Sequence, residues 1–518
     1  MATAAEGRAN PSNAASGGDV EKVLLAFFAA CHLLLLHYLF DARTAWLMTL
    51  LASGLLAPTA LRWARDAWRA PRDRAWLHAL PLLGLAILLC LLSGEAHVFY
   101  ANWDWMIRDA VLSDLVAHSW PVAYGVRGVT LLLRAPIGMY LFPALMGKLL
   151  GPGTAQLALL GQNALLLFAI LRGLTLAFEK PRQRWAAILV FTLFSGLDLP
   201  GQLLARARQG AVLLAPLPSH LEAWASLFQY SSHLTQLFWV PHHALAGWAF
   251  AAVALGVFRA GGSPLGLLAL AALLPLWSPF AAMGAAPFAL PALTRLDWRA
   301  LRKRIAPLAA LALLVAPALL YLQSDAGELE RHLLTLDARF ALDYLPFIAL
   351  EVIVYLLFLG DGLREPLTLV AACVLLLIPF YQIGFSNDFV MRASIPALAI
   401  LALAVAARVV EPSTPAGLRA ALVAVLLVGA ATPLFEIRAA LTLPAWPASR
   451  CNLLNAWTQS PVGHRLIDSY LMRQTSFAAA TLFQEGAPPL FALDLAQPCW
   501  PQPPVIRSWS PVATRPAR

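Results

Sequence analysis

The chain consists of about thirteen apolar runs joined by polar loops, and this repeating pattern limits the folds open to it. A membrane hydrocarbon core of roughly 30 Å is crossed by about 20 apolar residues in a helix. Mean hydropathy is +0.69, and 60% of the residues are hydrophobic while 13% are charged. These values exclude an ordinary soluble enzyme and predict an all-α, multi-pass membrane protein. The expected transmembrane helices are 23–40, 45–61, 76–94, 154–174, 185–197, 242–258, 264–278, 280–294, 306–322, 344–360, 366–382, 394–407 and 417–434.

Basic residues gather in the short loops on one side of this pattern. Segments 62–74 and 295–304 each carry five Lys or Arg residues. The positive-inside rule places these loops, and the amino terminus, in the cytoplasm. The net charge of +9 therefore reports topology and gives no reason to expect a nucleic-acid partner. The opposite, extracytoplasmic face then receives 95–153, 199–241, 323–343, 383–393 and the tail 436–518.

This threading divides the chain into three parts. Residues 1–20 are small and polar, which predicts a disordered cytoplasmic segment. Residues 21–435 form the transmembrane module, whose first outer loop, 95–153, is expected to carry interfacial helices. Residues 436–518 form a small extracytoplasmic segment. Four prolines interrupt 264–294, so that stretch is either two short helices or a re-entrant hairpin.

The cytoplasmic loops are too short to form a nucleotide-binding domain. No Walker A motif is present, and no GxGxxG follows a strand. An active site must therefore lie on the outer face or within the membrane, where an energy-rich reactant would arrive attached to lipid.

Two of the five cysteines lie in the polar tail. Cys451 and Cys499 are able to form a disulfide if the tail faces an oxidising compartment, and otherwise stay free. The other cysteines lie inside apolar runs and are interpreted as packing residues.

The strongest candidate site follows the apolar run 76–94. Asp104 lies between two tryptophans at the start of 105–118, which has helical amphipathic spacing. We interpret 105–118 as an interfacial helix, with a plain surface helix carrying solvated charges as the alternative. A carboxylate at the membrane exit is placed to act as a general base or metal ligand.

A second carboxylate is expected on the same face. Asp198 ends the run 185–197 and precedes Pro200, although 94 residues separate it from Asp104. Two loops that each present an Asp at one membrane level are the pattern that an active site requires. A carboxylate that simply ends a helix is the alternative.

A third constellation lies between two apolar helices on the outer face. It contains Asn387, Asp388 and Arg392. The i, i+4 spacing of Asp388 and Arg392 predicts an ion pair. The functional interpretation is that the Arg392 guanidinium binds a phosphate with its planar fork.

The outer loop before 242–258 is rich in His, Trp and Tyr. Glu222, His242 and His243 are candidates for substrate contact, and anchoring at the membrane interface explains the same residues equally well. His242 and His243 alone do not have a metal-ligand spacing. Glu351 lies inside an apolar run, where pairing between helices explains it.

Taken together, these residues resemble a known family. Asp104, the Trp-Pro-Val at 120–122, the segment 133–140, the segment 148–151 and a returning helix that ends in Asp198 are similar to the first outer loop of C-type (GT-C) glycosyltransferases. The likeness is greatest to the branch that contains aminoarabinose and protein mannosyl transferases, and it covers roughly residues 76–205.

The resemblance implies a GT-C-like helical bundle in a bacterial inner membrane. It implies transfer of a sugar, with inversion, from a polyprenyl-phosphate donor to a lipid, glycan or protein acceptor outside the cytoplasm. Asp104 would be the general base, and Asp198 would position the acceptor or, with Asp104, hold a divalent cation such as Mg²⁺ or Mn²⁺. Arg134 stands where the family segment has a Lys, which implies a donor contact.

Two other functions remain as alternatives. A transporter or flippase of lipid-linked sugars would carry inverted repeats and charges deep in its helices. A polysaccharide polymerase or ligase would use Arg331, His332 and Arg339 of the 323–343 loop. No internal repeat is visible, and the charges gather at the outer rim.

Overall fold

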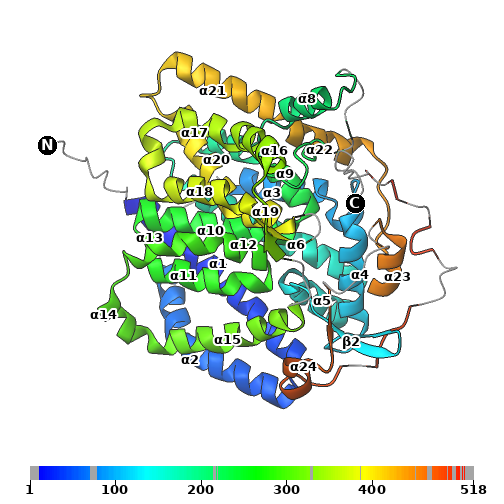
Figure 1. The fold of residues 1–518 in the computed structure, drawn as a ribbon. Helices are drawn as coiled ribbons and strands as arrows, with labels where there is room; N and C mark the ends of the chain where they lie inside the picture. Colours follow the sequence, from blue (N-terminus) through cyan, green and yellow to red (C-terminus); the bar gives the residue numbers. More distant parts are fainter. Residues whose placement is uncertain are drawn as a thin grey trace.

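The structure is a computed structural model that is mostly helical (71%) with little sheet. Figure 1 shows long helices stacked across the molecule. The described residues are 11–69, 79–213, 218, 220–326, 331–384, 387–449, 451–461, 463, 470–486, 488–492, 498–501, 504–505 and 507.

The elements follow the chain in this order: α1 (Pro11–Leu39), α2 (Ala42–Arg69), α3 (Leu80–Leu92), η2 (Glu95–His97), α4 (Asp104–Ala117), β1 (Ala123–Val126), β2 (Val129–Leu133), α5 (Gly138–Leu150), α6 (Gly153–Thr175), α7 (Pro181–Thr192), α8 (Asp198–Arg208), α9 (His233–Trp239), α10 (Pro241–Ala260), α11 (Pro264–Leu273), η3 (Leu274–Leu276), α12 (Pro279–Ala285), η4 (Ala286–Phe288), α13 (Ala289–Leu293), α14 (Trp298–Leu301), η5 (Arg302–Arg304), α15 (Ile305–Gln323), β3 (Arg331–Leu333), α16 (Ala338–Ile348), η7 (Ala349–Ile353), α17 (Val354–Leu359), η8 (Gly360–Arg364), α18 (Pro366–Leu377), η9 (Ile378–Phe380), β4 (Tyr381–Ile383), α19 (Asp388–Ala393), α20 (Ile395–Val410), α21 (Ala416–Gly429), α22 (Ala431–Thr442), α23 (Leu453–Gln459), β5 (Leu471–Arg473) and α24 (Phe477–Thr481).

Seven helices in the described part of the chain are long and apolar enough to cross a membrane. They are Gly18–Leu39, Ala42–Asp66, Gly153–Thr175, Pro241–Arg259, Arg302–Gln323, Ala338–Arg364 and Ala416–Thr442. Shorter apolar helices are Leu80–Leu92, Gly138–Leu150, Pro264–Leu276, Pro279–Leu293, Pro366–Phe380 and Ile395–Val410. Every expected span except 185–197 overlaps one of these helices, so the multi-pass helical class is confirmed while the number of crossings stays a prediction.

The expected span 185–197 is wrong in its bounds. α7 ends at Thr192, and the chain then crosses to the neighbouring helix, where the Leu197 N–H donates to the Leu350 carbonyl at 3.2 Å. That carbonyl belongs to η7, a π-helical turn. Gly196 packs against this turn so closely that a Cβ there would lie 1.6 Å from Glu351 Oε2. An unbroken helix through 197 would not allow these contacts.

The proline-rich stretch 264–294 forms short helical pieces. α11 and η3 make one apolar helix, and α12, η4 and α13 make the next. α13 packs back against α11, so the two pieces lie as a pair. Pro264 and Pro279 each stand in the first turn, where a missing N–H costs no hydrogen bond.

The amino-terminal prediction needs a correction. α1 begins at Pro11, so the second half of the segment 1–20, which we expected to be disordered, is helical. Residues 1–10 lie outside the described residues.

The first outer loop contains the expected helix at 105–118, but its charges are not solvated. Arg108, Asp109 and Asp114 of α4 are all buried. Asp109 Oδ2 lies 2.9 Å from His97 Nε2, and Asp114 Oδ2 accepts from the Tyr124 hydroxyl at 2.7 Å. The surface-helix interpretation of α4 is therefore wrong for these charges, because neighbouring segments cover the helix on most sides.

The tail covers α4. α23 packs against α4, and β5 joins β2 and β1 in a three-stranded antiparallel sheet with order β1-β2-β5. In Figure 1, α4, β2 and α23 lie together at the right, opposite α13 and α14 at the left. The loop 95–153 and the described part of the tail therefore pack against each other on one face of the molecule.

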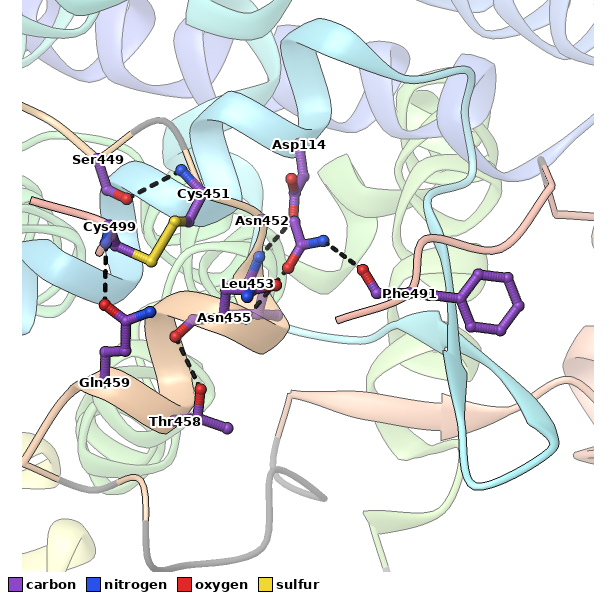
Figure 2. Close-up of a disulfide and its surroundings, with 10 residues drawn as sticks. All are labelled: Asp114, Ser449, Cys451, Asn452, Leu453, Asn455, Thr458, Gln459, Phe491 and Cys499. Atoms are coloured by element: carbon purple, nitrogen blue, oxygen red, sulfur yellow. Dashed lines mark hydrogen bonds between the residues drawn. A yellow bond between two sulfur atoms is a disulfide. The ribbon is translucent and has the colours of Figure 1, made fainter. Parts of the chain in front are cut away.

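Of the two states that the sequence left open for Cys451 and Cys499, the structure has the disulfide. Cys451 and Cys499 are bonded, with their Cα atoms 5.3 Å apart. Figure 2 shows the bond beside α23, where the Leu453 N–H donates to Asp114 Oδ2 of α4 at 2.8 Å. On its other side, the Cys499 N–H donates to Gln459 Oε1 at 2.9 Å. The bond thus ties two parts of the tail together directly above α4.

Candidate functional site

Asp104 opens α4 and is the partly accessible member of a charged group. Its side chain is 18% exposed, whereas that of Arg108 is 7% exposed. One helical turn separates the two residues, and Arg108 Nη2 donates to Asp104 Oδ2 at 2.9 Å. The Asn102 side chain accepts from the Asp104 N–H at 3.0 Å. These contacts orient the carboxylate while part of it stays open.

Arg392 of α19 belongs to the same group. Its Nη1 donates to Asp388 Oδ1, which confirms the predicted i, i+4 ion pair. Burial alone would lower the pKa of Arg392, but the carboxylates of Asp388 and Asp104 outweigh it and raise the pKa. Arg392 is therefore charged and lies within electrostatic reach of Asp104, although the two residues are 288 positions apart in sequence.

The paired histidines of α10 lie in the same neighbourhood. The His242 and His243 ring centroids are 4.0 Å apart, and His243 Nδ1 lies 2.6 Å from the Ser278 hydroxyl. His242 is within electrostatic reach of both Arg108 and Arg392. The helices α4, α19 and α10 thus bring guanidinium and imidazole groups to the Asp104 region.

Two tyrosines complete this region and were missed by sequence reasoning. Tyr140 of α5 and Tyr470 of the tail both lie within electrostatic reach of Asp104 and Arg108. Tyr140 falls inside the segment 133–140 that carried the family resemblance, which was a usable signal. Nothing in the sequence around Tyr470 indicated its position.

Several buried nitrogen atoms in the Asp104 region have no hydrogen-bond partner within the described part of the chain. They are Arg108 Nε, Arg108 Nη1, Arg392 Nε and His242 Nδ1. An unpaired buried polar group costs about 1–3 kcal/mol, and more when it is charged. Such donors on two guanidinium groups are suited to an anion with several acceptor oxygens.

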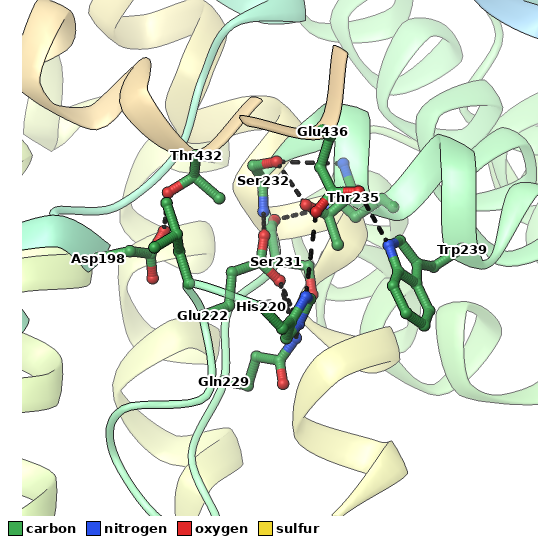
Figure 3. Close-up of polar contacts among 12 residues, drawn as sticks. Asp198, His220, Glu222, Gln229, Ser231, Ser232, Thr235, Trp239, Thr432 and Glu436 are labelled. Atoms are coloured by element: carbon green, nitrogen blue, oxygen red, sulfur yellow. Dashed lines mark hydrogen bonds and ion pairs between the residues drawn. The ribbon is translucent and has the colours of Figure 1, made fainter. Parts of the chain in front are cut away.

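Asp198 lies in a second group with a different character. It is 1% exposed and accepts from the Thr432 hydroxyl at 2.7 Å, the Ser195 hydroxyl at 2.8 Å and Trp224 Nε1 at 3.2 Å. Figure 3 shows Asp198 and Thr432 facing each other at the edge of this group. Burial raises the pKa of Asp198, and the hydrogen bonds offset part of that effect.

Glu222 is the centre of the second group. It accepts from the Ser232 N–H at 2.8 Å and from Gln229 Nε2 at 2.7 Å. Burial, followed by the negative charge of Asp198, raises the pKa of Glu222 to about 8. His220 Nε2 lies 3.6 Å from Glu222 Oε2, and burial lowers the pKa of His220 to about 4. At neutral pH this group therefore holds neutral Glu and His side chains.

Two further carboxylates border the second group and were missed as site residues. Glu436 of α22 receives a bidentate pair of hydrogen bonds from Arg507, each 2.8 Å long, and one from Trp239 Nε1 at 3.1 Å. Glu351 is buried in the π-helical turn η7 and lies within electrostatic reach of Asp198 and Glu222. Glu351 therefore contacts Asp198 of α8, so the expected pairing between helices is made with another acid.

The two groups are neighbours but have separate partners. The Trp103 and Trp239 rings lie 6.1 Å apart in an edge-to-face arrangement. Trp103 precedes Asp104, and Trp239 binds Glu436, so these indoles form the boundary. Asp104 is bound by Arg108, and Asp198 by hydroxyl and indole donors.

Arg134 and Asn387 lie at the edges of the Asp104 region. Arg134 Nη1 donates to the Leu322 carbonyl at 3.2 Å, so its guanidinium contacts α15. Its backbone N–H donates to the Tyr470 carbonyl at 2.7 Å. Asn387 Nδ2 donates to the Leu227 carbonyl at 3.2 Å, while its Oδ1 is buried with no partner in the described residues.

The residues present do not fit a divalent cation. Within the described residues, no group of three or more His, Cys, Asp or Glu side chains is arranged to hold a metal ion. Asp198 directs its oxygens at hydrogen-bond donors, and Asp104 directs one at a guanidinium. We therefore derive no step through Mg²⁺ or Mn²⁺.

Comparisons with known proteins return no match to a family model, to a curated protein or to a solved structure. The functional argument consequently depends on the residues of this chain.

Proposed function

We propose that the protein is a membrane glycosyltransferase that moves a sugar from a polyprenyl-phosphate donor to an acceptor outside the cytoplasm, with inversion. The observation that supports this most is the set of unpaired buried donors on Arg108 and Arg392, with the unpaired His242 Nδ1, beside the partly open Asp104 carboxylate. A catalyst for this reaction needs a cationic site for a phosphate and a base beside it.

A phosphate monoester fits the unpaired donors better than a neutral ligand does. Each guanidinium offers N–H groups in a planar fork that matches phosphate oxygens. Arg108 Nη2 and Arg392 Nη1 are already bound to carboxylates, which hold each fork in place. The remaining donors then face a ligand without further ordering, and such pre-organisation favours binding.

The reaction assigns one role to each group. The acceptor hydroxyl oxygen attacks the anomeric carbon as its proton passes to Asp104, and the bond from that carbon to the phosphate oxygen breaks. The electron pair leaves with the lipid phosphate, whose growing charge is stabilised by Arg108 and Arg392. A single displacement inverts the anomeric carbon. General-base assistance of this kind contributes about 10²–10⁴-fold to the rate.

The location follows from the same proposal. The donor's lipid must lie in a bilayer, which the long apolar helices fit. We infer that the face formed by α4 and the disulfide-bonded tail is extracytoplasmic, because a structural disulfide is typical of an oxidising compartment. The lipid, glycan or protein acceptor would approach from that face.

Glycosyl transfer in vesicles tests the proposal. The full chain is reconstituted with radiolabelled polyprenyl-phosphate sugars and a membrane extract as the acceptor source, and Asp104→Asn is compared with the native protein. We expect transfer to fall by about 10²–10⁴-fold, the value of a lost general base. Asp361→Asn is the matched control, because Asp361 is an exposed loop carboxylate.

Equal transfer by Asp104→Asn and the native protein would refute the role of Asp104. The second candidate function is a transporter of lipid-linked sugars. Glu351 favours it, because a buried carboxylate inside a long apolar helix suits transport. Movement of the labelled lipid across the vesicle without sugar transfer would favour that candidate.

A further inference from the structure

A cavity of about 420 Å³ opens beside the Asp198 group. Its walls come from the last turns of α8, the loop at 224–226 and the first half of α16. The lining residues are Leu204, Ala205, Arg208, Gln209, Trp224, Ala225, Ser226, Arg339, Leu342 and Asp343. None of these residues contributes to the Asp104 region, so the cavity is a separate site.

The cavity wall is held rigidly at Trp224. The indole Nε1 donates to Asp198 Oδ1 at 3.2 Å. Its ring lies against α8 at Gly201, where a Cβ would come within 2.3 Å of the ring. Only glycine allows this approach. The next residues continue the rigid wall, since Ser226 has a φ of 54°, a strained value for a residue other than glycine.

Charged side chains from α8 and α16 line the cavity. Arg208 ends α8 and donates through Nη1 to the Leu342 carbonyl of α16 at 2.8 Å. Arg339 is exposed and makes no hydrogen bond or ion pair with the described part of the chain. Asp343 stands one turn after Arg339 without pairing with it. Two arginines and one aspartate leave a net positive lining.

We propose that this cavity binds the anionic part of the acceptor, a saccharide that bears a phosphate or carboxylate group, outside the reacting centre at Asp104. An aromatic ring with Arg, Asp, Gln and Ser side chains offers the apolar face and the hydrogen bonds that a sugar requires, and Arg208 and Arg339 select the anionic group. The role of this ligand as an acceptor rests on the proposed function, whereas the binding of an anionic saccharide does not. The anionic sugar is either soluble or carried by a lipid.

Asp198 is then a positioning residue that acts through Trp224. It does not touch the ligand, because it is buried behind the indole and its oxygens accept from protein donors. The family resemblance implied that Asp198 positions the acceptor. It would do so by holding the Trp224 ring in place.

Arginine labelling tests the cavity directly. The full chain in detergent micelles is treated with phenylglyoxal, and labelling of each arginine is quantified by peptide mass spectrometry. The probes are glucose 6-phosphate, glucuronate, glucose, and a micelle containing phosphatidylinositol phosphate. We expect either anionic sugar, or the lipid probe alone if the sugar is lipid-borne, to reduce labelling of Arg339 at least fivefold, and glucose to have no effect. Arg364 is the internal reference, since its side chain is 86% exposed and it lies outside the cavity.

Variants separate binding from a change in shape. Arg339→Gln should abolish protection of Arg208, while Arg331→Gln, an exposed arginine outside the cavity, should preserve it. Trp224→Phe should weaken protection, because it removes the indole N–H that binds Asp198. Unchanged labelling of Arg208 and Arg339 with every probe would overturn the proposal. Protection without any sugar transfer in vesicles would leave the cavity assignment standing and remove the proposed function.

Discussion

The Asp104 and Asp198 regions are neighbours with opposite hydrogen-bond chemistry. Around Asp104, buried guanidinium donors of Arg108 and Arg392 lack partners in the described chain. Around Asp198, the carboxylate accepts from Ser195, Thr432 and Trp224. Unused donors suit an anionic ligand, whereas a carboxylate that already accepts from protein donors suits a positioning role. The two aspartates therefore differ in their hydrogen-bond partners, although they look alike in sequence.

The largest effect should come from the disulfide that holds the tail over the Asp104 region. Cys451→Ser removes a cross-link between residues 48 apart. The chain-entropy relation gives a loss of about 4 kcal/mol for a loop of this length. Limited proteolysis should then cut the tail much faster than in the native protein. Cys373→Ser is the control, since Cys373 is a free cysteine.

Equal proteolysis of Cys451→Ser and the control would show that the tail is held by its other contacts. In that case the Asp104 region would not depend on the disulfide.

The next effect concerns the donors of Arg392. Arg392→Gln removes both the positive charge and the planar set of guanidinium N–H donors, whereas Arg392→Lys keeps the charge and removes only the planar set of donors. Hydrogen bonds to charged groups contribute about 1.5–3 kcal/mol, so KM for the lipid-phosphate donor should rise about 10–100-fold in Arg392→Gln. Arg392→Lys should recover part of this loss. Arg364→Gln, on the surface, should leave KM unchanged. A change confined to kcat would contradict a donor-binding role.

Asp198→Asn should affect stability more than Asp104→Asn does. In Asp198→Asn, an amide NH2 replaces one carboxylate oxygen and must face a hydroxyl or indole that donated to that oxygen. This mismatch lowers the free energy of unfolding by about 1–3 kcal/mol. Asp104→Asn keeps an oxygen for Arg108 and leaves the other position partly open. Thermal unfolding in detergent measures the contrast. An Asp104→Asn protein that unfolds at a lower temperature than Asp198→Asn would reverse the comparison.

The smallest effect is a pH dependence carried by Glu222. Its folded-state pKa is raised from 4.5 to about 8, so the folded protein binds one more proton than the unfolded chain between these values. The contribution of Glu222 to stability is present below pH 4.5 and is lost as the pH rises toward 8. Glu222→Gln should flatten the fall in unfolding temperature across this window. An unchanged slope would mean that Glu222 is ionised in the folded protein.

The sequence predicted the helices better than it predicted their surroundings. Apolar runs report burial in lipid or protein directly, so most spans were located within a few residues. The end of α7 was missed because it depends on Leu197 reaching the Leu350 carbonyl of another helix. No local pattern encodes that contact.

The same distinction applies to the site. Asp104, Arg392 and His242 were predicted from their place in outer loops, and the structure brings them to one region. Glu351 was assigned to helix pairing without a partner, and the burial of Arg108 was not predicted, because a single sequence does not show which charges meet. Glu436 and Arg507 form a bidentate pair across 71 residues, which only the folded tail reveals.

The most direct test of the central claim is binding of a polyprenyl monophosphate, the proposed leaving group, to the purified protein. Native protein, Arg108→Gln and Arg364→Gln are titrated in the same micelles, with thermal unfolding measured for each. We expect Arg108→Gln to bind about 10–100-fold more weakly, since donors on a charged group contribute about 1.5–3 kcal/mol, and Arg364→Gln to match the native protein. Equal affinity for all three proteins would contradict an anion site at Asp104, Arg108 and Arg392.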